Sequence, residues 1–200
     1  MELTSDWGKA AKLASGLSAR FQRAVAQATA QEAQQIRGNI VKGIRAGKGF
    51  APLSPMTLAI RKAGGFGGSK ALIRTGALIG AITAVKVGGG WFVGLLRQAK
   101  SKGGKSLANV GAIHEFGASW TQPFTAKSRR FLFAMLRKAG LSRGGPRAGG
   151  PGGGGGKTTL SITIPARPFI GPVVEAAQKD LAKRFWGRVA KAMGGDLGSV

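Results

Sequence analysis

The chain has 200 residues, of which 43% are hydrophobic, so it can bury a core, and we expect one domain over residues 1–200. It has no cysteine and a single histidine, His114, which excludes disulfides, zinc–thiolate centres, cysteine nucleophiles and histidine-rich metal cages. We therefore expect no metal and no cofactor. The N-terminal residues do not follow the pattern of a signal peptide, and no apolar run approaches the roughly 18 residues of a membrane span, so we expect no membrane partner.

The net charge of +24 is unevenly distributed along the chain. Between Ala33 and Val174 the only acid is Glu115, against 22 lysines and arginines. Internal ion pairs cannot neutralise such a segment. The charge is compatible with contact to nucleic acid, with a surface that fits acidic neighbours in an assembly, or with a merely solubilising surface, because charge alone supplies only non-specific attraction.

The N-terminal part of the chain has the pattern of helices. Apolar residues from Leu17 to Ile44 recur at the spacing of one helical face, which predicts a long amphipathic helix. Glycines 47 and 49 are expected to end this helix. Residues 5–14 predict a separate helix before it.

A shorter helix is predicted after the long one. Ser54 followed by Pro55 is typical of an N-cap and a first helical residue, and the helix is expected to run through Lys62. Residues 64–68 form a glycine-rich loop.

The middle of the chain contains two β-prone runs, residues 81–87 and 91–96. The three glycines 88–90 between them predict a hairpin. A lysine-rich loop over residues 99–106 then precedes a predicted short helix, Leu107 to Phe116.

The C-terminal third begins with a glycine-rich insertion at about residues 140–157, whose composition cannot form a core by itself. From Leu160 to Ile164 apolar and polar residues alternate strictly, which predicts a half-buried strand. A closing amphipathic helix is predicted from Val173 to about Met193.

Proline residues make the connection between this strand and the closing helix stiff. Pro165 and Pro168 fix φ and favour extended geometry in the preceding residues, and Pro172 suits the first turn of a helix. The junction is therefore expected to hold Arg167 and Phe169 in defined directions.

Two motifs resemble a nucleotide-binding site and a catalytic site, but the residues around them exclude both interpretations. Residues 152–158 read as a glycine-rich run followed by Lys157, but Pro151 replaces the first required glycine, and a strand follows where a helix should begin. His114 and Glu115 are adjacent on a predicted helix, point about 100° apart and have no triad partner. The sequence thus predicts no enzymatic activity, no catalytic residue and a structural role for His114.

Basic and aromatic residues are mixed from Ser128 to Lys138, as in proteins that bind single-stranded nucleic acid. The aromatic side chains divide between two helical faces, so an amphipathic helix with long basic side chains is the simpler interpretation. The candidate residues for an interface or for facing DNA are Arg129, Arg130, Arg137, Lys138, Arg143 and Arg147.

Four stretches together resemble the virion morphogenesis family, the tail-completion proteins of Mu-like and related tailed phages. They are Phe50–Leu58 with Arg61 and Lys62, Leu72–Leu78, Ala112–Gly117, and Ile164–Gly171. The pair IHEFG and IPARPFIG is the specific part of the resemblance. Ala51 departs from the pattern, since an aromatic residue often stands there, and the glycine-rich insertion is unusually long.

The resemblance implies an α+β fold, with a small, mostly antiparallel sheet covered by the long N-terminal helix and the C-terminal helix. Thr75 and Gly76 can supply a cap and a tight turn, and Gly117 can end a helix with positive φ. Phe116 and Phe169 would be core anchors, and Arg167 a donor to a carboxylate or carbonyl group. The motif residues are Pro52, Leu53, Thr57, Thr75, Gly76, Leu78, Ile113, His114, Phe116, Gly117, Pro165, Arg167, Pro168 and Phe169.

The function that the resemblance implies is structural. Such a protein assembles in the host cytoplasm as a ring, expected to be a hexamer, and lies in the virion at the neck or the head-proximal end of the tail. Its partners would be tail-tube and neck or connector proteins, with possible non-specific contact to packaged DNA. The competing hypotheses are a free-standing basic nucleic-acid-binding protein and a cationic membrane-active protein; the spread of charges among loops weakens the latter.

Overall fold

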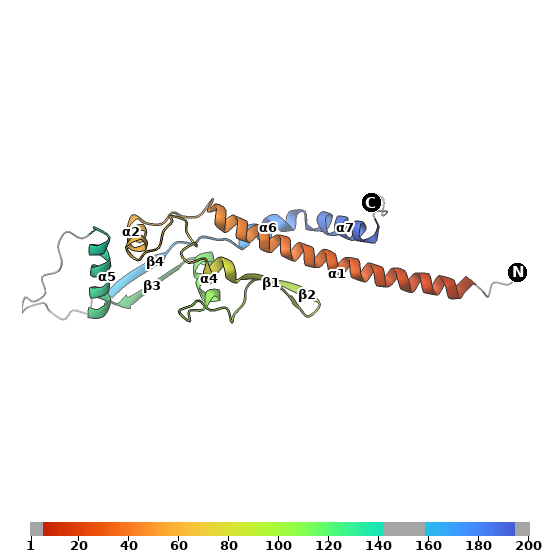
Figure 1. Cartoon of the computed structure of the whole chain (residues 1–200), viewed down its shortest axis with the longest axis horizontal. Helices are drawn as coiled ribbons and strands as arrows, with labels where there is room; N and C mark the ends of the chain where they lie inside the picture. The colour runs from red at the N-terminus through yellow and green to blue at the C-terminus, as the bar shows by residue number, and fades with distance from the viewer. Residues whose placement is uncertain (1–5, 142–158, 195–200) are drawn as a thin grey trace, which may run out of the picture. The chain divides into compact units, whose positions relative to one another are not determined.

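The computed structural model describes residues 6–141 and 159–194 (Figure 1). Within these ranges it has seven helices and two two-stranded sheets, which confirms the predicted α+β class. The strands form two separate sheets rather than one. The elements in chain order are α1 (Asp6–Ala46), α2 (Pro55–Ala63), α3 (Ala77–Ala81), β1 (Ile82–Val87), β2 (Gly90–Leu95), α4 (Leu107–Phe116), β3 (Ala118–Pro123), α5 (Ala126–Lys138), β4 (Thr159–Ile164), α6 (Gly171–Lys179) and α7 (Leu181–Met193).

The described chain divides into two compact units. The first unit comprises residues 6–40, 83–94 and 172–194, and the second comprises residues 41–82, 95–141 and 159–171. Four elements, α1, β1, β2 and α6, contribute residues to both units.

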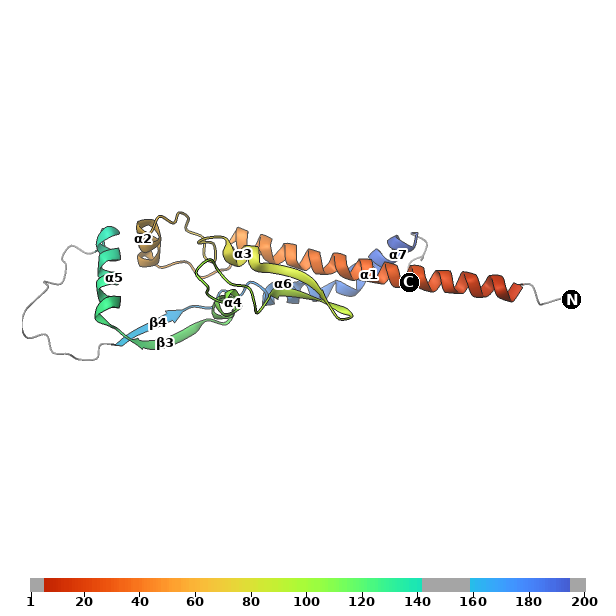
Figure 2. The ribbon, with the colours of Figure 1, turned by 60° about the horizontal axis from the view of Figure 1, so that its bottom comes forward.

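In the first unit α1 packs against α7 through small side chains. Ala24 and Ala28 are almost completely buried and form a cluster with Val189, while Val25, Phe185 and Met193 pack around them. Figure 2 shows the two helices side by side. Small residues on α1 allow the close approach, so the larger apolar side chains of this contact come mainly from α7.

The predicted separate helix at residues 5–14 is wrong, because α1 is one helix from Asp6 to Ala46. Gly16 lies between the two predicted helices, and a glycine costs only about 1 kcal/mol relative to alanine inside a helix. The alanines and leucines around it are good helix formers, so the helix continues. It ends as predicted, with Gly47 at a φ of 68°.

The predicted single closing helix is also wrong, because α6 ends at Lys179 and α7 begins at Leu181. Asp180 lies between them with φ −118° and ψ 13°, outside helical geometry. Aspartate is a weak helix former that favours such positions. The side chain of Arg184 donates to the carbonyl of Ala177 at 3.0 Å and so satisfies an acceptor at the break.

The predicted hairpin is confirmed as β1 and β2, which pair with each other. Gly88, at a φ of 56°, supplies the left-handed conformation that a tight hairpin turn requires. The short helix α3 before β1 was not predicted. Its N-cap is Gly76, again with positive φ.

The second sheet joins β4, which was predicted, to β3, which was not. The strands are antiparallel, with Trp120 opposite Ile162. On the other face the hydroxyls of Ser119 and Thr163 lie 3.0 Å apart. The exposure alternates along β4 as its sequence predicts, so one face carries the apolar side chains and the other the hydroxyls.

Helices α2 and α4 have the predicted bounds to within one residue. The hydroxyl of Ser54 accepts from the N–H of Thr57 at 3.2 Å, as expected of an N-cap ahead of Pro55. Ser106 caps α4 in the same way. The cap at Ser106 begins α4, whose last residues carry most of the IHEFG motif.

Candidate functional site

Arg167 lies at the centre of the C-terminal motif in the second unit. The residue is 5% exposed in spite of its charge. Its Nε donates to the carbonyl of Ala51 at 2.7 Å and its Nη2 donates to the carbonyl of Pro52 at 3.2 Å. Its backbone N–H donates to the carbonyl of His114 at 2.6 Å. Arg167 therefore links three of the four motif stretches, and the expectation of a carbonyl partner is confirmed.

Glu115 holds the chain at the start of α6. Its Oε2 accepts the backbone N–H groups of Phe169 and Ile170 at 2.8 and 3.0 Å, and its Oε1 accepts that of Gly171 at 2.7 Å. These donors would otherwise lack partners at a helix start, and a carboxylate suits them because of its charge. The adjacent His114 takes no part, so the two residues form no dyad.

The two motif phenylalanines have opposite environments. Phe169 is 3% exposed, which confirms its predicted burial. Phe116 is 81% exposed, so its prediction as a core anchor is wrong. Phe116 is the last residue of α4, where the helix turns away at Gly117, and its ring extends into solvent.

Two glycines around α4 have close neighbours, which are backbone atoms at Gly117 and side-chain atoms at Gly111. Gly117 has φ 76°, and a Cβ there would lie 3.0 Å from the nitrogen of Ala166. A Cβ at Gly111 would lie 2.2 Å from Cδ1 of Leu95 and 3.6 Å from Phe169. Gly117 thus ends α4 with positive φ as predicted, and it also lets the C-terminal motif cross closely.

His114 is half-buried, and its Nδ1 is buried without a hydrogen-bond partner. Burial lowers the pKa of this imidazole, and the positive charges of Arg167 and Arg61 lower it further. The backbone carbonyl of His114 accepts the N–H of Arg167, while the imidazole Nδ1 has no hydrogen-bond partner among the described residues. A neutral imidazole is consistent with the predicted structural role.

The motif stretch Leu72–Leu78 forms a turn before the first sheet. The hydroxyl of Thr75 accepts from the N–H of Ala77 at 3.4 Å, and Gly76 has a φ of 74°. Leu78 is buried. Leu72 has a φ of 63°, which is strained for a leucine. Of the motif residues not yet placed, the half-buried ones are Leu53, Thr57 and Ile113, and the exposed ones are Pro165 and Pro168.

The predicted basic interface residues separate into two groups. Arg129, Arg130, Arg137 and Lys138 are exposed on α5, which packs against α2 and has no fully buried residue. A groove of about 440 Å³ beside α5 is lined by Phe124, Lys127 and Phe131, among others. Arg143 and Arg147, with the glycine-rich insertion, lie outside the described residues.

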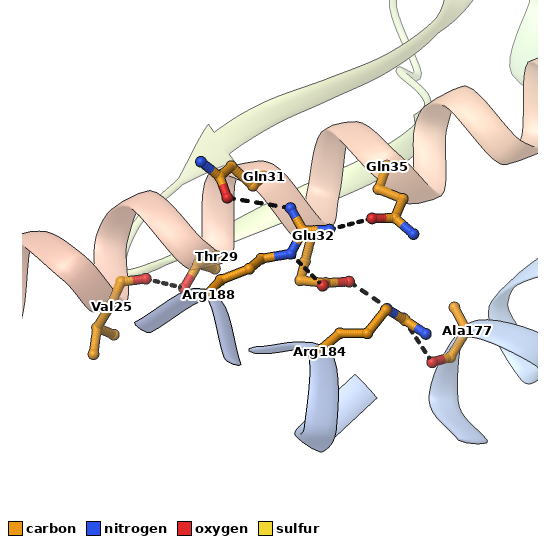
Figure 3. Close-up of polar contacts among 8 residues, drawn as sticks. All are labelled: Val25, Thr29, Gln31, Glu32, Gln35, Ala177, Arg184 and Arg188. Carbon is orange, nitrogen blue, oxygen red and sulfur yellow. Dashed lines mark hydrogen bonds and ion pairs between the residues drawn. The ribbon is translucent and has the colours of Figure 1, made fainter. Parts of the chain in front are cut away.

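Glu32 organises a polar cluster between α1 and α7 of the first unit (Figure 3). The carboxylate is 5% exposed and lies 2.9 Å from Nε of Arg188 and 3.2 Å from Nη2 of Arg184. Arg188 also donates to the side-chain oxygens of Gln31 and Gln35. The cluster joins three polar residues of α1 to two arginines of α7.

Several large apolar side chains of the first unit remain exposed. They are Leu17, Phe21, Val87, Phe92, Leu181 and Trp186. The N-terminal turns of α1 extend beyond α7 in both views (Figures 1 and 2). A groove of about 360 Å³ runs between α1 and the hairpin, lined by Phe21, Val25 and Trp91 among others. Exposed apolar side chains that gather in one place mark interaction surfaces, and Phe21 and Trp91 line one groove.

Comparison of the chain with models of protein families, with curated proteins and with solved structures found no match in any of the three. In the described part of the chain, no helix is long and apolar enough to cross a membrane. The same residues contain no cluster of three or more histidine or acidic side chains placed to bind a metal.

Sequence reasoning missed the role of Glu115, which it considered only as a partner of His114. Glu115 is the single acid between Ala33 and Val174, and this isolation in the sequence could have indicated a specific role. It also missed the spatial convergence of Arg61, Arg74 and Lys105, which come from separate segments and line one cavity. Only the tertiary fold brings these three side chains together.

Proposed function

We propose that this chain is a structural subunit of a tailed-phage virion, which forms a ring at the neck or the head-proximal end of the tail. The ring completes the tail and supports its joining to the filled head. The resemblance of four motif stretches to tail-completion proteins is the basis of this proposal.

The observation that supports the proposal is that motif side chains bind the backbone of other motif stretches. Arg167 and Glu115 bind backbone groups of the other motif stretches, and Phe169 is buried beside Gly111. Side chains that hold backbone in place maintain the shape of a subunit. Shape, rather than turnover, is what an assembly protein supplies, so the motifs fit a structural function.

The first unit offers a surface that a neighbouring subunit could cover. Phe21 and Trp186 are 40% and 55% exposed. Burial of such aromatic groups is a major source of affinity in protein interfaces. We expect them to contribute to contacts within the ring.

A free-standing nucleic-acid-binding protein is the second candidate. Its support is the charge of the second unit, where Glu115 is the only acid among the described residues and is engaged by three backbone amides. The remaining ionisable surface of that unit is therefore basic. Charge of one sign attracts phosphate backbones without sequence preference.

Deletion of the gene in a producing phage tests the structural proposal. We expect DNA-filled heads and tails that fail to join or to terminate correctly, seen by electron microscopy, and we expect the protein in purified wild-type particles. Normal, infectious particles from the deletion strain would contradict the proposal. A free nucleic-acid-binding protein would be absent from purified particles.

The oligomeric state of the purified chain tests the ring directly. Native mass spectrometry should show a closed oligomer, expected to be a hexamer. Trp186→Ser should weaken the oligomer, whereas Trp120→Ser, at an exposed tryptophan of the second unit, serves as the matched control. A monomer at all concentrations, also in the presence of tail-tube protein, would argue against ring formation.

A further inference from the structure

The second unit contains a cavity of about 460 Å³ whose polar lining is cationic. Arg61, Arg74 and Lys105 line it from three separate segments, together with Thr75, Ser101 and His114. Within the described residues, no acidic side chain lines the cavity. Because Arg74, Thr75 and Lys105 are exposed, the cavity is open to solvent.

The positive charges around this cavity are not compensated. Burial lowers the pKa of Arg61, and the positive charges of Arg74 and Arg167 lower it further. Arg167 and Arg61 also lower the pKa of His114. Burial is the larger cause of both shifts, and the smaller contribution is repulsion among cationic groups that have no acidic side chain in the lining. An anion in the cavity would relieve this repulsion.

Local contacts hold the cationic groups in place. Nη1 of Arg61 donates to the carbonyl of Lys70 at 3.0 Å, and the guanidinium of Arg74 lies 4.7 Å from the ring centroid of Phe66. Such restraint lowers the entropy lost on binding a ligand.

The hydroxyls are restrained in a similar way. Thr75 accepts from the N–H of Ala77, and Ser101 accepts from the N–H of Lys105 at 3.2 Å. Because each oxygen already accepts a backbone proton, the hydroxyl hydrogen is suited to donation toward a ligand.

Two further features lie at the same cavity. The Nδ1 of His114 is buried without a partner. Leu72, which also lines the cavity, has a positive φ of 63°. Strained backbone of this kind is concentrated at ligand sites.

We propose that this cavity binds a phosphate group. Three cations and two hydroxyls offer more donors and more charge than the two oxygens and single charge of a carboxylate can use. A phosphate has more acceptor oxygens and carries up to two negative charges at neutral pH, so it matches the lining. Guanidinium groups are also well shaped to contact phosphate oxygens in pairs.

This site is independent of the proposed ring, because every lining residue belongs to one unit of a single chain. The phosphate can come from a small free ligand or from a nucleic-acid backbone. The two sources share the same chemistry and differ in size, so a titration can distinguish them.

The single histidine provides the probe. The imidazole of His114 in the full chain is followed by NMR in chloride buffer while inorganic phosphate is added at constant ionic strength. We expect saturable shifts and a rise in the pKa of His114, because a bound anion favours the imidazolium. Unchanged His114 signals, or equal shifts with acetate, would overturn the proposal.

Short duplex DNA of arbitrary sequence forms the second arm. If the DNA displaces inorganic phosphate and shifts the His114 signals, the site binds backbone phosphates. If inorganic phosphate binds and the DNA does not, the site binds a small phosphate ligand. Both results support a phosphate site and identify its source.

Variants at the mouth of the cavity test the assignment of the residues. Lys105→Gln and Arg74→Gln should each weaken phosphate binding about tenfold, the loss expected for one charge-assisted hydrogen bond. Lys62→Gln, an exposed neighbour of Arg61 outside the cavity, is the matched control and should bind as the parent does. Circular dichroism confirms that each variant is folded. Equal weakening by Lys62→Gln and Lys105→Gln would show a general charge effect and overturn the site.

Discussion

The carboxylate of Glu115 accepts the backbone N–H of Gly171 at 2.7 Å, which joins the end of α4 to the start of α6 across 56 residues of sequence. Two further amides, of Phe169 and Ile170, bind the same carboxylate. The only acid in a long basic segment is therefore half-buried and binds backbone amides of the fold. Among the described residues of the second unit, no other acidic side chain is present to pair with the surrounding lysines and arginines.

Substitution of Glu115 by glutamine should destabilise the second unit. The amide NH₂ would face backbone donors and leave at least one of them unpaired, which lowers the free energy of unfolding by about 1–3 kcal/mol. Urea unfolding measures the change, with Glu175→Gln at an exposed position as the control. Equal midpoints for Glu115→Gln and the parent would contradict the role of this carboxylate.

Phe169 and Phe116 form a matched pair for a test of burial. Phe169→Ala removes a buried ring, and we expect a loss of about 3–5 kcal/mol. Phe116→Ala removes an exposed ring, and a change within about 0.5 kcal/mol is expected. Thermal unfolding distinguishes the two variants. A larger loss for Phe116→Ala would mean that the isolated chain buries this ring against another copy.

Local patterns in the sequence were sufficient for most elements of the fold. Alternation predicted β4, and the pair Ser54–Pro55 marked the start of α2, because caps and periodicity depend on neighbouring residues. Strand β3 was not predicted, since its residues are mostly exposed and its pairing with β4 depends on a distant segment.

The candidate site was predictable only in part. The proline-restricted junction predicted defined directions for Arg167 and Phe169, and the family motifs predicted that Phe169 is a core residue and that Arg167 donates to a carboxylate or carbonyl group. The environment of Phe116 could not be predicted, because a residue at a helix end can face the core or the solvent, and only the path after Gly117 decides which. The three amide partners of Glu115 also depend on tertiary contacts.

Replacement of Arg167 by lysine tests the need for a planar donor. A lysine ammonium cannot reproduce the fork that contacts the carbonyls of Ala51 and Pro52, so one acceptor loses its partner. We expect a decrease of about 1–3 kcal/mol in the free energy of unfolding. Arg130→Lys, at an exposed position on α5, should change stability little. If the two substitutions have the same effect, the fork geometry is unimportant.

Stability should depend on pH through His114. Burial, Arg167 and Arg61 lower its pKa in the folded chain below the ordinary value of 6.5, and Arg74 and Lys105 line the same cavity. The unfolded chain therefore binds more protons on acidification, so stability is greatest above the unfolded pKa and decreases as the pH falls through the folded one. Urea unfolding between about pH 7.5 and pH 5 in phosphate-free buffer measures this slope. His114→Gln should reduce the slope, and an unchanged slope in that variant would assign the pH dependence to other groups.

The contact between α1 and α7 should depend on the charge of Glu32. Glu32→Gln removes the charge that compensates Arg184 and Arg188 at a buried position, and we expect a loss of about 3 kcal/mol, since breaking a buried pair leaves charges without a partner. Gln34→Ala, exposed on the same helix, is the control. Replacing the three charged residues together, Glu32→Leu with Arg184→Met and Arg188→Met, should restore much of the stability because no unpaired charge remains.

The comparison of the single and triple variants separates two roles of the Glu32 cluster. If the triple variant is stable but no longer forms the oligomer of the parent in native mass spectrometry, the ion pairs fix the register of α7 that assembly requires. If the triple variant is as unstable as Glu32→Gln, the polar cluster itself stabilises the helix contact, and the unpaired charges are not the reason for the loss.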